Sequence, residues 1–173
     1  MSDVTAPRID GERQWQSHME MAKIGATPGG GVCRLSLSDE DKISRDLFVS
    51  WAKNAGCHVR VDRVGNIFVR RLGAELDLPP VMTGSHLDTQ PLGGRFDGAY
   101  GVLAGLEVVR ALNDAHIRTR HPVDIVIWTD EEGCRFTTKT MGSAVFAGLR
   151  PEADVLDGVD PDGIRFGDEL VRI

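Results

Sequence analysis

The segment that decides the fold runs from residue 81 to residue 130. It contains VMTGSH at 81–86, AYGVLAGLEVVRALNDA at 99–115 and VDIVIWTD at 123–130. The first run indicates a strand, and the second a helix with small residues on one side. The third is apolar and rich in β-branched residues, which is typical of a strand buried on both faces. A strand, a helix and a strand in this order, with a crossover of this length, predict a βαβ unit and a parallel sheet.

The residues before this segment predict two helices and two short strands. An amphipathic pattern covers 11–23 (GERQWQSHMEMAK), and Ser38 has the character of an N-cap because three acidic residues follow it. Gly56 then ends the second helix as a C-cap glycine. Two strand-like runs follow, CHVRVDRV and NIFVRR, which meet near a glycine. The helices and strands predicted along the chain therefore indicate an α/β fold.

Bulk composition excludes several classes of protein. The 173 residues are 41% hydrophobic and 27% charged, with a net charge of −6, which is typical of a soluble protein without a basic surface for nucleic acid. The polar N-terminal stretch lacks the apolar core of a secretory signal, and no apolar run has transmembrane length. Three unclustered cysteines fit a reducing compartment and exclude a CxxC-type zinc site. We expect a cytoplasmic location, with no nucleic-acid or membrane partner.

Five chemically active side chains follow the two strands of the βαβ unit. His86 ends the first strand within GSHLDTQPLGGRFDGAYG (84–101), which also holds Asp88 and Asp97, and Glu131 and Glu132 follow the second strand. In open α/β sheets, sites form at the carboxyl ends of the strands. We therefore expect the imidazole and the four carboxylates to converge at one edge of the sheet.

The four carboxylates of such a cluster repel one another unless a cation lies between them. Imidazole and carboxylate suit zinc, and also manganese or cobalt. Asp88 could orient an imidazole, and the neighbouring Glu131 and Glu132 side chains are expected to diverge, so that one binds metal and the other serves as general base. Plainer readings remain open at this point: a solvated glutamate pair, and an aspartate that caps the next helix at Tyr100 or Gly101.

Longer motifs carry a family resemblance. The run GSHLDTQPLGGRFDGAYGVLAGLEVVRAL, followed by VIWTDEEGCRF and MGSAVFAG, closely resembles the two-metal aminoacylase and carboxypeptidase-G-like superfamily. Its hydantoinase/carbamoylase branch contains N-carbamoyl-L-amino-acid hydrolases, bacterial β-ureidopropionases and allantoate amidohydrolases. WQSHMEMAKIGATPGGGVCRL and DRVGNIFVRR look like the same branch, so the resemblance covers nearly the whole chain.

The resemblance implies a fold, a reaction and a set of roles. The fold would be a zinc-exopeptidase-like, three-layer α/β/α arrangement with a largely parallel central sheet. His86 and Glu132 would each bind one of two divalent ions, zinc or manganese with cobalt and nickel as further options, and Asp97 would bridge them. Glu131 would be the general base and Asp88 would steady an imidazole ligand. The substrate would be an N-carbamoyl or related ureido compound, hydrolysed at a linear, non-peptide C–N bond.

Members of the branch extend further than this chain. They hold two more histidine ligands and an inserted dimerisation domain, through which they form homodimers, whereas this sequence ends at GDELVRI. His116 and His121 are expected at the wrong end of the sheet to replace those ligands. We therefore expect residues 1–173 to form the N-terminal part of a catalytic domain, incomplete at its C-terminal side and with an exposed sheet edge. The alternatives are an inactive truncated product and a non-enzymatic partner of a full-length relative.

Overall fold

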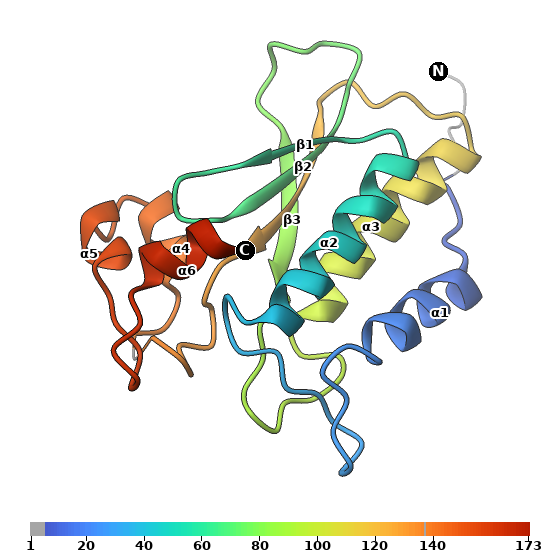
Figure 1. The fold of residues 1–173 in the computed structure, drawn as a ribbon. Coiled ribbons are helices and arrows are strands. Elements are labelled where there is room, and N and C mark those ends of the chain that lie inside the picture. The colour runs from blue at the N-terminus through green and yellow to red at the C-terminus, as the bar shows by residue number, and fades with distance from the viewer. Residues whose placement is uncertain (1–5, 137) are drawn as a thin grey trace.

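A computed structural model describes residues 6–136 and 138–173, and four strands form one sheet at its centre (Figure 1). The strand order is β1-β2-β4-β3, with the bounds β1 His58–Val61, β2 Ile67–Arg71, β3 Val81–His86 and β4 Val123–Trp128. β3 and β4 pair in parallel, as the predicted βαβ unit requires. The other two pairings are antiparallel. The α/β class is confirmed, but the sheet of the described residues is mixed. The tight turn at Gly65 joins β1 to β2, and a turn this short can only connect antiparallel neighbours.

The three longer helices match the predicted ones. They are α1 Gly11–Met21, α2 Asp39–Asn54 and α3 Ala99–Asp114. The Ser38 hydroxyl accepts a hydrogen bond from the Asp41 N–H at the start of α2, and Gly56 takes a left-handed conformation (φ 81°) after its end. Three short helices follow: α4 Met141–Phe146, α5 Glu152–Leu156 and α6 Phe166–Arg172. Among the described residues, no helix combines the length and the apolar character needed to cross a bilayer.

α2 and α3 cover one face of the sheet (Figure 1). The small residues of α3 let it approach closely, since a Cβ added to Gly101 would lie 2.9 Å from Ser85 Cβ, and one added to Gly105 would lie 3.1 Å from Ile125. The main core lies between these layers, with Leu103 and Leu106 of α3 fully buried. This close contact holds β3 and β4 side by side and so positions their carboxyl ends.

A second, smaller core lies beneath the loop that follows β4. Its buried members come from that loop, from the C-terminal helices, from the residues before α2 and from the β1–β2 turn: Phe136, Met141, Val155, Phe166, Leu37 and Val64. On the sheet face opposite α2 and α3, Phe146 of α4 packs against Phe68 and Trp128, with ring centroids 5.6 Å and 5.1 Å apart. These contacts form a thin third layer and anchor the loop that carries Glu131 and Glu132.

β3 lies at the edge of the sheet. Within residues 6–136 and 138–173 its one strand partner is β4, and Val81 is 61% exposed. An open strand edge presents unpaired main-chain N–H and C=O groups. The exposed edge expected from the sequence is therefore present.

Candidate metal centre

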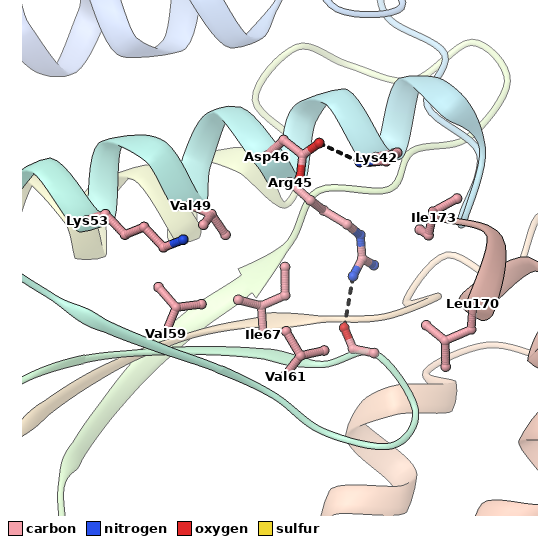
Figure 2. A pocket seen from close by; sticks show the side chains of 11 residues that line it. Lys42, Arg45, Asp46, Val49, Lys53, Val59, Val61, Ile67, Leu170 and Ile173 are labelled. Carbon is pink, nitrogen blue, oxygen red and sulfur yellow. Dashed lines mark hydrogen bonds and ion pairs between the residues drawn. The ribbon is translucent and has the colours of Figure 1, made fainter.

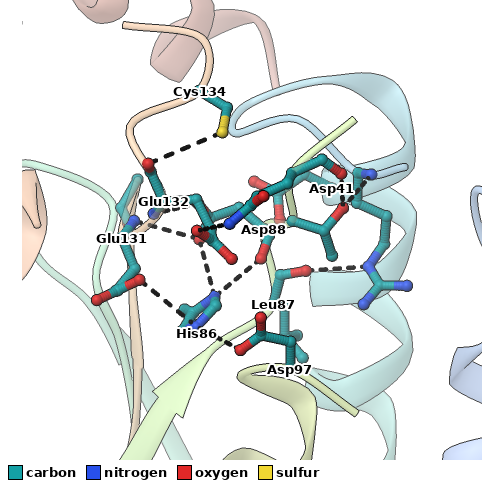
Figure 3. Close-up of polar contacts among 12 residues, drawn as sticks. Asp41, His86, Leu87, Asp88, Asp97, Glu131, Glu132 and Cys134 are labelled. Atoms are coloured by element: carbon teal, nitrogen blue, oxygen red, sulfur yellow. Dashed lines mark hydrogen bonds and ion pairs between the residues drawn. The ribbon is translucent and has the colours of Figure 1, made fainter. Parts of the chain in front are cut away.

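The carboxyl ends of β3 and β4 bring the predicted site residues together. The parallel register sets His86 beside Trp128, and Glu131 and Glu132 follow in the next loop (Figure 3). One nitrogen of His86 and one carboxylate oxygen from each glutamate all lie within 4.8 Å of one another. Residues that are 45 or more positions apart in sequence thus form one cluster at the strand ends.

Asp97 returns to this cluster from the glycine-rich loop. Its Oδ1 lies 3.9 Å from His86 Nε2, and its carboxylate is 58% exposed. The return depends on Gly98, which has φ 64°, since an added Cβ would lie 2.5 Å from three atoms of the His86 ring. In the part of the chain that the structure describes, the Asp97 carboxylate makes no hydrogen bond to the first turn of α3, whose Tyr100 and Gly101 N–H groups bond to main-chain carbonyls. The helix-capping interpretation is therefore wrong, and the Asp97 carboxylate is free to bind a ligand.

The His86 ring is held in one tautomer. Its Nδ1 lies 2.8 Å from the main-chain carbonyl oxygen of Asp88. Because a carbonyl only accepts, Nδ1 carries the hydrogen and Nε2 keeps its lone pair. That lone pair faces Glu131 Oε2 at 3.6 Å and Asp97 Oδ1 at 3.9 Å. The ring is buried except for this side, as suits a metal-binding imidazole.

The Asp88 carboxylate lies beneath the site and is almost completely buried. It accepts hydrogen bonds from the main-chain N–H groups of Glu132 (3.1 Å) and Glu131 (3.4 Å). Burial raises the pKa of this carboxyl group to about 6, and the negative charge of Asp41 contributes to the rise. His86 Nδ1–H thus donates its hydrogen bond to the main-chain carbonyl of Asp88, while the Asp88 carboxylate accepts from the glutamate loop.

The glutamate side chains converge instead of diverging. The expected divergence assumed extended backbone, but β4 ends at Trp128 and Asp130 has φ 54°, in the left-handed region. The chain turns there, so neighbouring side chains no longer alternate. Both Glu131 and Glu132 therefore offer an oxygen to the same group as His86.

The sequence reasoning missed two polar residues near the cluster. Gln90 donates a hydrogen bond from Nε2 to Glu132 Oε2 (3.1 Å). Asp130 is completely buried, and burial, followed by the charge of Asp88, raises its pKa to about 7. The available signals were a polar residue two positions after Asp88 and a third acid before the glutamate pair.

The donor set fits a divalent cation. An imidazole lone pair faces two carboxylates at distances too long for hydrogen bonds, and Glu132 adds a third carboxylate close by. Like charges at this spacing repel one another, and a cation between them reverses the sign of that interaction. Nitrogen and oxygen ligands suit zinc, manganese and related ions. His116 and His121 lie at the other end of the sheet, beyond α3 and before β4.

A groove of about 390 Å³ lies apart from this cluster (Figure 2). It runs between α2 and the β1–β2 hairpin, and α6 residue Leu170 contributes to its lining. Its other lining residues include Val49, Ile67 and the two lysines Lys42 and Lys53. None of the five predicted site residues lines it, so the site is defined by the strand ends and not by this groove.

Comparisons with known proteins agree with this fold. Residues 82–167 match peptidase family M20/M25/M40. An N-carbamoyl-L-amino-acid amidohydrolase from Rhizobium meliloti is 49% identical over 96% of this chain and 40% of its own length. One from Geobacillus stearothermophilus is 44% identical over 94% of this chain and 39% of its own length. The crystal structure of a hydantoinase/carbamoylase family amidase from Burkholderia ambifaria has a TM-score of 0.96 at 57% identity, covering 97% of this chain and 42% of that one.

The α/β sheet, the acidic and imidazole side chains at its strand ends and these similarities together identify the family of the chain. The chain belongs to peptidase family M20/M25/M40, in which divalent metal ions are used. Within that family it falls in the hydantoinase/carbamoylase branch, as the resemblance of its motifs predicted. The chain spans about two fifths of the length of these relatives.

Proposed function

We propose that this chain is part of a metal-dependent amidohydrolase that cleaves a linear, non-peptide C–N bond in N-carbamoyl-amino acids or related ureido compounds. The observation that carries the proposal is the convergence of His86, Glu131 and Glu132, with Asp97 beside them, at the carboxyl ends of β3 and β4. The names of the Rhizobium and Geobacillus relatives support the substrate class.

Each of the four side chains has a proposed role. His86 would hold one divalent ion, Glu132 would hold a second, and Asp97 would be a ligand shared by both. Zinc and manganese are the first candidates, and cobalt and nickel suit the same ligands. A bound ion supplies Lewis acidity, which polarises a carbonyl oxygen and lowers the pKa of a water.

Glu131 acts as the general base. Its carboxylate is about one third exposed, so it reaches both the cluster and the solvent side from which substrate approaches. It takes a proton from the attacking water and returns it to the leaving nitrogen when the C–N bond breaks. For an N-carbamoyl-amino acid, the products are the free amino acid and carbamic acid, which decomposes to carbon dioxide and ammonia.

We also propose that residues 1–173 form the N-terminal part of a catalytic domain. The open edge of β3, with Val81 and Met82 exposed, supports this arrangement, since a further strand would complete it. The remaining catalytic residues and a dimerisation domain would lie in the part of the relatives that this chain does not span. The longer protein would then be a homodimer.

Ammonia release tests the proposal. The chain is loaded with zinc or manganese and given an N-carbamoyl-L-amino acid, β-ureidopropionate or allantoate, beside Glu131→Gln and the surface control Glu20→Gln on α1. Where the chain turns over a substrate, Glu131→Gln should lower the rate by roughly 10²–10⁴-fold and Glu20→Gln should leave it unchanged.

The contrary results are equally specific. Folded chain that binds metal but releases no ammonia from any of these substrates would contradict activity of the 173 residues and support the inactive alternative. A stable complex with a full-length relative, under the same conditions, would support the partner alternative.

A further inference from the structure

The main chain at Glu131 and Glu132 forms a small anion-binding concavity. Successive N–H groups of a strand point to opposite sides, but here both point to one carboxylate. The turned backbone explains this, because Asp130 and Gly133 on either side have φ values of 54° and 62°. Such a run of N–H groups is a known cradle for negative charge.

The occupant of this concavity is the Asp88 carboxylate. Asp88 Oδ2 accepts from the Glu132 N–H at 3.1 Å, and Oδ1 lies 3.4 Å from the Glu131 nitrogen. The side chain is 1% exposed, so no water competes for these donors. The two N–H groups belong to the residues that carry the proposed base and one proposed metal ligand.

The same carboxylate makes no hydrogen bond to the His86 ring. Its Oδ1 is 3.7 Å from His86 Nδ1, an ion-pair distance, whereas the main-chain carbonyl of Asp88 accepts a hydrogen bond from that nitrogen at 2.8 Å (Figure 3). The hydrogen bond to the ring is therefore made by the main chain at position 88, and the carboxylate adds only the longer contact.

We propose that Asp88 is a positioning residue for the glutamate loop: its carboxylate clamps the main chain of Glu131 and Glu132, while its main-chain carbonyl accepts the hydrogen bond from His86 Nδ1. The inference rests on the proposed function only for the roles of the three residues it positions. It joins the end of β3 to the loop after β4, so one residue orders both sides of the site.

Substitutions separate the two contacts. Asp88→Asn keeps the size and the carbonyl, but its amide oxygen can serve one of the two N–H groups while its NH₂ group faces the other. Asp88→Ala removes both contacts to the glutamate loop and also keeps the carbonyl. Asp62→Asn is a matched control, because the Asp62 carboxylate accepts from the N–H groups of Val64 and Asn66 in the β1–β2 turn.

NMR of metal-free, ¹⁵N-labelled protein tests the inference. In Asp88→Asn we expect the Glu131 and Glu132 amide resonances to shift and their hydrogen exchange to accelerate, while the ¹⁵N shifts of the His86 ring still report hydrogen on Nδ1. Affinity for Co²⁺, followed by its visible absorption, should fall roughly 10–100-fold in Asp88→Asn and stay unchanged in Asp62→Asn.

Two results would overturn the proposed positioning role of Asp88. A change of His86 tautomer in Asp88→Asn, with both glutamate amides unmoved, would show that the carboxylate acts on the ring. Absence of a through-hydrogen-bond coupling between the Glu132 amide nitrogen and the Asp88 carboxyl carbon in the unmodified chain would show that the clamp does not form, even if the variants fail to fold. None of these measurements uses a substrate, so they stand or fall separately from the proposed activity.

Discussion

Gly98→Ala is the change that most directly tests how the site is built. Gly98 has φ 64° and ψ −51°, outside the left-handed α region and close to the strained classic γ-turn, where a side chain costs roughly 1–3 kcal/mol. The new Cβ would also lie 2.5 Å from the His86 ring and must separate by about 0.9 Å to reach ordinary contact at 3.4 Å. Overpacking of this kind costs typically 1–3 kcal/mol. We expect the free energy of unfolding, measured in urea, to fall by roughly 2–6 kcal/mol.

The matched control is Gly56→Ala. Gly56 has φ 81° but no atom within 4 Å of an added Cβ, so this change introduces strain without a clash. It should cost only about 1–2 kcal/mol and leave the affinity for zinc or manganese unchanged. In Gly98→Ala the displaced His86 ring should weaken that affinity by roughly tenfold or more, measured by titration calorimetry. Equal losses of stability in the two variants, with equal metal affinity, would refute the reasoning.

Three further predictions follow from charges in and near the site. The pKa of Asp130 is raised from its ordinary 3.8 to about 7, so its contribution to stability is complete below pH 3.8 and is lost as the pH rises through 7. Metal-free chain should therefore gain roughly 2–4 kcal/mol from Asp130→Asn at pH 8 and little at pH 4, and urea curves that shift equally at both pH values would contradict this. Asp41 and Arg45 form a buried ion pair with a nitrogen–oxygen distance of 2.9 Å. Asp41→Ala should cost about 3–5 kcal/mol because it leaves the guanidinium uncompensated, and the double change with Arg45→Met should cost less in the same urea experiment. Zinc at 100 times its Kd should stabilise the chain by about 2.7 kcal/mol, and a chelator should reverse the rise in Tm. Glu132→Gln should abolish most of this rise, whereas an equal rise in both proteins would remove Glu132 from the site.

The local pattern of the sequence predicted the elements that surround the site. The strand that ends at His86, the helix from residue 99 and the strand from residue 123 all lie where apolar periodicity, caps and glycines placed them. These signals act over a few residues, since a cap or a turn satisfies main-chain groups close to it in sequence. The pairing of β2 with β4 carries no such local signal and came only from the structure.

Helix α2 shows where a periodic pattern misleads. Helical spacing in the sequence places Ile43 on one apolar face with Leu47, Phe48 and Trp51. In the structure Ile43 is 54% exposed, whereas Arg45 is buried. The Arg45 guanidinium pairs with Asp41 one turn earlier in the same helix. It also donates a hydrogen bond to the carbonyl of Gly65 in the β1–β2 turn, a tertiary contact that the helix pattern does not contain. A charged side chain becomes a core residue only when such partners are present.

The sequence by itself determined the βαβ unit, the strand ends and the residue types that meet there. His86, Asp97, Glu131 and Glu132 were predictable because parallel strands joined by one helix must place their carboxyl ends at the same edge. Only the tertiary structure decided how those residues are held. The hydrogen bonds from the glutamate loop to Asp88 and Gln90 join positions more than 40 residues apart, and they act on a loop that turns at Asp130. Their geometry depends on how the loop after β4 packs against the second core, and no short stretch of sequence records that packing.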